Sequence, residues 1–85
     1  MNDLNITFCR SLLAATMTDV RKHTTAEQRK AAWVIRTDRS RWEFHGPERF
    51  YWYGRADNAY DARSSGWAAW LRQQGVNGYA TEEVP

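Results

Sequence analysis

Residues 33–55 read WVIRTDRSRWEFHGPERFYWYGR, and large apolar side chains alternate with polar ones along this stretch with a period of two. Successive side chains of an extended strand point to opposite faces of a sheet, so the alternation predicts β-structure with two unlike faces. The residues expected to face the core are Trp33, Ile35, Trp42, Phe44, Phe50 and Trp52. The residues expected on the opposite, polar face are Arg36, Arg41, Glu43, His45, Tyr51, Tyr53 and Arg55.

Two polar breaks divide this stretch into three short strands. Asp38-Arg39-Ser40 has the length of a turn, and Gly46-Pro47-Glu48 is a strong turn signal. Glycine permits unusual backbone dihedral angles, and proline has no N–H to donate to a strand ladder. Short turns between consecutive strands predict an antiparallel β-meander over residues 33–55.

Residues 5–32 show a helical rhythm before the predicted sheet. Phe8 and Leu12 fall on one stripe of a helix over residues 5–22. Thr24 and Thr25 each begin a capping-box pattern that predicts a second short helix, although a kinked continuation of the first helix fits as well.

Residues 57–75 return to helical spacing after the predicted sheet. Tyr60, Trp67 and Leu71 share one stripe, and Ser64-Ser65-Gly66 weakens the middle, so we expect a bent helix or two helices. Residues 76–85 are expected to form a loosely held tail. The predicted fold is a single α+β domain over residues 1–85, in which N-terminal and C-terminal helices pack on one face of a three-stranded antiparallel sheet.

The composition sets limits on both the core and the partners. The chain has 85 residues, enough for one small core, and its five Trp, four Tyr and three Phe supply the large side chains. Twelve basic residues against ten acidic ones give a net charge of +2, a weaker excess than a typical nucleic-acid-binding arm has. Ten of the basic residues are Arg, which recognition surfaces favour and which a GC-rich coding sequence also favours.

Cys9 is the single cysteine, so an internal disulfide is excluded, and with two His the chain cannot complete a usual structural zinc site. No signal-peptide pattern is present, and no segment approaches the roughly 20 apolar residues of a membrane span. We therefore expect a cytoplasmic protein without a metal, a cofactor or a membrane partner.

The sequence also lacks common catalytic signatures, including a glycine-rich phosphate loop, a G-x-S-x-G elbow and an H-E-x-x-H motif. His45 could serve as a general base, or it could be an exposed strand residue without a task. Asp57 and Asp61 are four residues apart, but helix capping and neighbouring arginines explain them without a metal. We expect a protein that is not an enzyme and has no catalytic residue.

The polar sheet face is the candidate partner-binding site. Tyr, Trp and Arg concentrate binding energy at protein interfaces, and interleaved acidic residues give charge complementarity to a mixed partner surface. The predicted contacts are Arg36, Arg41, His45, Tyr51, Tyr53 and Arg55, with Arg39 and Arg49 near the turns as second-rank candidates. A protein partner is the leading hypothesis.

Three alternatives remain open for this face. Bases could stack on Tyr51 and Tyr53 while arginines contact phosphates, and a three-stranded sheet followed by a helix is similar in outline to sheet-reading DNA-binding domains of integrases. The segment 36–63 holds six Arg against five acidic residues, a net charge that gives little counterion-release affinity. The N-terminal helix could instead cover the face, or an exposed edge strand could pair with a second copy of the chain.

The closing segments Phe50-Tyr51-Trp52-Tyr53-Gly54-Arg55-Ala56 and Gly66-Trp67-Ala68-Ala69-Trp70-Leu71 resemble the strand-then-helix endings of small bacteriophage and prophage proteins that inhibit host machinery, including anti-CRISPR proteins. The resemblance covers the C-terminal half and contains no diagnostic motif, so it assigns no functional residue. It implies a protein that acts in the cytoplasm of a bacterial host and binds a host protein or protein complex. Many such inhibitors are acidic DNA mimics, and this basic chain departs from that pattern.

Overall fold

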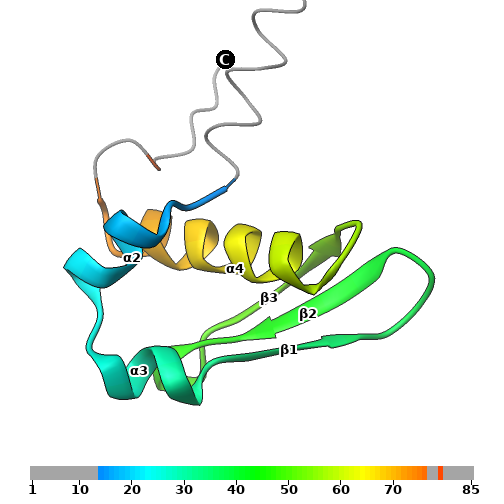
Figure 1. Cartoon of the computed structure of the whole chain (residues 1–85), viewed down its shortest axis with the longest axis horizontal. Helices are drawn as coiled ribbons and strands as arrows, with labels where there is room; N and C mark the ends of the chain where they lie inside the picture. The colour runs from blue at the N-terminus through cyan, green and yellow to red at the C-terminus, as the bar shows by residue number, and fades with distance from the viewer. Residues whose placement is uncertain (1–13, 77–78, 80–85) are drawn as a thin grey trace, which may run out of the picture.

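A computed structural model describes residues 14–76 and residue 79, and it has the expected α+β architecture (Figure 1). In chain order the elements are α2 (Met17–His23), α3 (Ala26–Ala31), β1 (Trp33–Arg36), β2 (Arg41–His45), the 3₁₀ turn η1 (Pro47–Arg49), β3 (Tyr51–Arg55) and α4 (Ala59–Gln73). The three strands form one antiparallel sheet in the order β1-β2-β3. The longest helix, α4, crosses one face of this sheet, and α2 lies beside α4 (Figure 1).

Within residues 14–32 the chain forms two short helices instead of one long helix. Thr16 caps α2 by accepting a hydrogen bond from the backbone N–H of Asp19 at 3.1 Å. Thr25 and Gln28 form a complete capping box at the start of α3, which confirms the second of the two predicted capping boxes. Ala15 and Thr16 are not helical, so the expected continuous helix over 5–22 is wrong in its described part. Phe8, Cys9 and Leu12 lie outside the described residues.

The sheet register confirms the predicted faces of β2 and β3 and corrects the face of β1. Phe44 pairs with Trp52, and Val34 pairs with Phe44 on the other side. Cross-strand partners share a face, so Val34 and not Trp33 or Ile35 joins the core side. The side facing α4 carries Val34, Arg36, Trp42, Phe44, Trp52 and Gly54. The prediction that Trp33 and Ile35 point inward and Arg36 outward is therefore wrong.

Phe44 is the centre of the core. It is fully buried, and its ring meets the ring of Trp67 edge to face with a centroid distance of 5.1 Å. Gly66 allows this approach, because a Cβ built at that position would overlap the Phe44 side chain. The small residue thus brings α4 close to the sheet, and Leu71 is buried one turn further along.

Helix α4 runs without interruption from Ala59 to Gln73, so of the two forms that the sequence allowed, the two separate helices do not occur. Asn58 caps its start by accepting a hydrogen bond from the N–H of Asp61 at 2.8 Å. Tyr60 is 71% exposed, which corrects its predicted place on the buried stripe with Trp67 and Leu71.

Part of the predicted tail is held against the core. Tyr79 is buried, and its hydroxyl donates a 2.6 Å hydrogen bond to the Asp19 carboxylate. Burial raises the pKa of Tyr79 above its ordinary value of 10.0, and the hydrogen bond to Asp19 raises it further. The expectation of a loose tail is therefore wrong at Tyr79, and residues 77–78 and 80–85 lie outside the described residues.

Candidate functional site: the open face of the sheet

The side of the sheet that faces away from α4 carries a group of large exposed side chains, and we call it the open face. Its members are Trp33, Ile35, Arg41, Glu43, His45, Tyr51, Tyr53 and Arg55. Trp33 is 48% exposed, Ile35 46%, Tyr51 48% and Tyr53 63%. A described helix packed on this face would have buried these side chains, so within the described residues the face is uncovered.

The register arranges the open face in three rows that cross the strands. Trp33, His45 and Tyr51 form an aromatic row, one residue from each strand. The Trp33 and His45 rings are stacked with centroids 3.9 Å apart and planes 4° from parallel. The Tyr51 ring meets His45 edge to face at 5.2 Å. His45 is thereby fixed between two rings, and the row presents one continuous aromatic surface.

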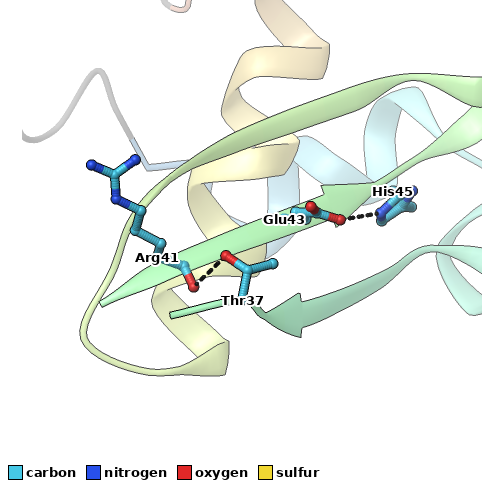
Figure 2. A network of polar contacts seen from close by, with 4 residues as sticks. All are labelled: Thr37, Arg41, Glu43 and His45. Atoms are coloured by element: carbon cyan, nitrogen blue, oxygen red, sulfur yellow. Dashed lines mark hydrogen bonds and ion pairs between the residues drawn. The ribbon is translucent and has the colours of Figure 1, made fainter. Parts of the chain in front are cut away.

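The middle row consists of Ile35, Glu43 and Tyr53. Glu43 is the acidic member of the open face, and its Oε1 lies 3.1 Å from His45 Nε2 (Figure 2). Desolvation raises the pKa of Tyr51 above its ordinary value of 10.0, and the neighbouring Glu43 carboxylate raises it further. Tyr51 is therefore a neutral hydrogen-bond donor at physiological pH.

The basic row contains Arg41 and Arg55, which face each other directly across β2 and β3. Both side chains are exposed, and in the described part of the chain neither has a carboxylate within 4.0 Å. Figure 2 shows the Arg41 guanidinium directed away from Glu43, while the Arg41 backbone carbonyl accepts a hydrogen bond from Thr37 Oγ1 at 3.3 Å. Two like charges placed opposite each other destabilise a sheet, so this pair favours an anion between them.

Arg36 does not join the other predicted contacts. It lies on the side of the sheet that faces α4, and its guanidinium closes the β1–β2 connection. Its Nε donates to the carbonyl of Asp38 at 3.2 Å and its Nη2 donates to the carbonyl of Arg39 at 2.6 Å. The structure gives Arg36 a role in shaping the turn that precedes the basic row.

The two second-rank arginines lie at opposite ends of the sheet. Arg39 is exposed in the β1–β2 connection, close in sequence to the basic row. Arg49 lies in η1 with a φ of 66°, next to Glu48 with a φ of 54°. Both lie in the left-handed region, which costs a non-glycine residue roughly 1–2 kcal/mol.

A shallow groove of about 460 Å³ adjoins the aromatic row. It lies between the η1 turn and the end of α4, and Phe50, Tyr51, Trp70 and Gln73 are among the residues that line it. Tyr51 belongs to both, but the α4 residues in the lining place the groove toward the α4 side of the sheet and not on the open face.

Sequence reasoning thus identified six of the eight members of the open face, Glu43 and five of the predicted contacts, and missed two. Arg41, His45, Tyr51, Tyr53 and Arg55 share one face as predicted. Trp33 and Ile35 were assigned to the core, since large apolar side chains usually lie inside. The sequence shows the alternation of β1, but which of its residues face the core depends on how β1 pairs with β2. This pairing depends on the conformation of the four-residue connection, which the sequence does not fix.

In the described part of the chain, no three His, Cys, Asp or Glu side chains are grouped so that they could hold a metal ion. No helix within residues 14–76 is both long and apolar enough to traverse a bilayer. Comparison of the chain with protein-family models, with curated proteins and with solved structures finds no match. The functional interpretation therefore depends on the geometry and chemistry of the open face.

Proposed function

We propose that this protein is a non-enzymatic binding module and that another macromolecule docks on its open face. The observation that carries the proposal is the exposure of Trp33, Ile35, Tyr51 and Tyr53 on one side of a single sheet. Exposed apolar residues are normal when scattered, whereas a contiguous group of them marks an interaction site. Exposed arginines lie at one end of the group, so the face carries Trp, Tyr and Arg, the residue types that contribute most of the binding energy at interfaces.

The partner class proposed from the sequence is a protein of a bacterial host, and docking on the open face would inhibit that protein. Ile35 supports a protein partner, because an exposed aliphatic side chain on the same face as Trp33 suits the apolar centre of a protein interface. A nucleic acid is the second candidate, and the Arg41–Arg55 pair favours it.

The proposal is tested by affinity capture from a bacterial lysate, performed with and without nuclease. The decisive variant is Tyr51→Ala with Tyr53→Ala, and Tyr60→Ala is the matched control because Tyr60 is exposed on α4 and away from the open face. We expect a bound macromolecule to be retained by the wild type and by the control and to be lost from the double variant. Equal retention by all three proteins would contradict the proposal.

A further inference from the structure

The charges of the open face are separated along the sheet, although their sum is as small as that of the sequence segment that forms it: the face carries Arg41 and Arg55 and one acid, Glu43. Within residues 36–63, the acidic side chains nearly balance the arginines. In the fold Glu48 lies in η1 at the opposite end of the sheet and Asp61 lies in the first turn of α4. Asp38 stays in the β1–β2 connection, where its carboxylate accepts a hydrogen bond from the N–H of Arg39 at 2.7 Å. Glu43 remains on the open face, and its carboxylate is paired with His45. The two arginines at one end of the face can therefore attract an anion locally, although the net charge of the whole face is small.

The Arg41–Arg55 pair is suited to a phosphate group. Directly opposed residues on neighbouring antiparallel strands have Cβ atoms about 4.5–5.5 Å apart, so two exposed guanidinium groups can converge on one anion. Guanidinium groups bind phosphate oxygens through paired, charge-assisted hydrogen bonds. Arg39 in the adjoining turn lies on the same end of the sheet and is also exposed.

The aromatic side chains beside this pair are suited to unpaired bases. Tyr53 lies two residues before Arg55 on β3 and shares its face, and the Tyr53 ring centroid is 6.1 Å from that of Tyr51. Trp33 lies on an edge strand, and among the described residues its ring contact is with His45 on one side. Exposed rings on a sheet bind bases by stacking, which requires bases that are free of a duplex.

We propose that the open face binds single-stranded nucleic acid, with the phosphate backbone at Arg41 and Arg55 and bases against Tyr53, Tyr51 and Trp33. This inference rests on the proposed function, because it concerns the same face, and it takes up the second of the two partner classes named there, with a host protein as the alternative outcome of the tests. It predicts binding with little sequence preference, since stacking accepts any base and the phosphate contacts carry no sequence information.

The first test measures the fluorescence anisotropy of a labelled oligothymidine of about 15 nucleotides, titrated with the full chain. We expect saturable binding that weakens from about 50 to about 200 mM salt, with a logarithmic slope near −1.4 if two phosphates are neutralised on a single strand. Arg41→Ala with Arg55→Ala should weaken binding and flatten the salt dependence. The matched control is Arg21→Ala with Lys22→Ala, which removes two charges from α2 and should leave the slope unchanged.

The second test uses the rings. Tyr53→Ala alone should weaken oligothymidine binding by about tenfold or more, because each stacked base contributes appreciably to affinity. Tyr60→Ala is again the control and should bind as the wild type does. Titration should also quench tryptophan fluorescence, and Trp33→Phe should remove most of the quenching, since the other described tryptophans lie on the α4 side. Thermal unfolding of each variant separates a loss of binding from a loss of folding.

Four results would overturn the inference. These are no oligothymidine binding at low salt, equal binding of a hairpin duplex, an equal effect of the α2 control variant, and lysate capture that yields a nuclease-resistant protein partner on the open face. The last result would leave the proposed function intact and replace the nucleic acid by a protein. A lysate partner unaffected by Tyr51→Ala with Tyr53→Ala would instead contradict the proposed function itself.

Discussion

The two faces of the sheet are built from alternate residues of the same strands, yet their environments are opposite. On the α4 side Phe44 is fully buried against Gly66 and Trp67. One residue away along β2, Glu43 and His45 lie on the open face beside Tyr53, which is 63% exposed. The difference indicates that stability depends mainly on the α4 side and that the open face is free to serve binding.

The largest effect is expected for Phe44→Ala. The substitution removes the ring at the centre of the core and leaves a cavity, so it should lower the free energy of unfolding by about 3–5 kcal/mol. The free energy of unfolding of a small domain is about 5–15 kcal/mol in total, so Phe44→Ala would remove much of the stability. Urea denaturation followed by circular dichroism measures this, and a loss below about 1 kcal/mol would contradict the position of the core.

Gly66→Ala tests the close approach of α4 to the sheet. The added methyl group would overlap the Phe44 side chain, and such overpacking costs about 1–3 kcal/mol despite the better helix propensity of alanine. Ser65→Ala, at the neighbouring position of the same helix, is the control and should be nearly neutral. A stabilised Gly66→Ala protein would show that α4 does not contact Phe44.

Tyr79→Phe tests whether the packed side extends to the end of the described chain. The hydroxyl hydrogen bond to Asp19 should contribute about 1 kcal/mol. Because the pKa of Tyr79 is raised in the folded state, its contribution is fully present below pH 10.0 and is lost as the pH rises through the folded-state pKa. The wild type should therefore lose stability at alkaline pH, and Tyr79→Phe should show a smaller loss. Identical pH profiles for the two proteins would contradict this contact.

Tyr51→Ala with Tyr53→Ala tests the other side of the comparison. Cross-strand pairs contribute about 0.2–1 kcal/mol each, so the double variant should unfold at nearly the wild-type urea concentration while binding is abolished. A loss of stability as large as that of Phe44→Ala would place these rings in the core and remove the distinction between the faces.

The smallest changes in stability are expected at Arg36 and Arg41. The Arg36 guanidinium donates to exposed backbone carbonyls of the β1–β2 connection, so Arg36→Ala should lose about 0.5–1.5 kcal/mol, and oligothymidine binding should change little. Arg41→Ala is the matched comparison and should reverse the pattern, with almost no effect on stability and weaker binding. Equal binding losses for both variants would place Arg36 in the binding site after all.

The fold class, the three strands and most of the open face could be predicted from the sequence, because the period-two alternation of β2 and β3 is strong and the Gly46-Pro47 turn fixes their relation. The phase of β1 could not be predicted from hydrophobicity. Trp33 and Ile35 are larger and more apolar than Val34 and Arg36, so they seemed the better core residues. The pairing with β2 decided otherwise, because the register places Val34 opposite the fully buried Phe44 and directs Trp33 and Ile35 to the open face.

The continuity of α4 and the position of Gly66 show a second limit of sequence reasoning. Glycine in a helix usually signals a break, since it lowers helix propensity by about 1 kcal/mol. Here the absence of a side chain is required by the contact with Phe44, a tertiary reason that no local pattern reveals. The same holds for Arg36, whose turn contacts depend on the shape of the β1–β2 connection.

The measurement that tests the uncovered open face most directly is solvent paramagnetic relaxation, recorded by NMR on the full chain with a soluble gadolinium chelate. Side-chain protons of Trp33, Ile35 and Tyr53 should relax strongly, and those of Phe44, Trp67 and Leu71 should be protected. Protection of Trp33 and Ile35 together with Tyr53 would show that another part of the chain or a second copy covers this face, and would contradict the account.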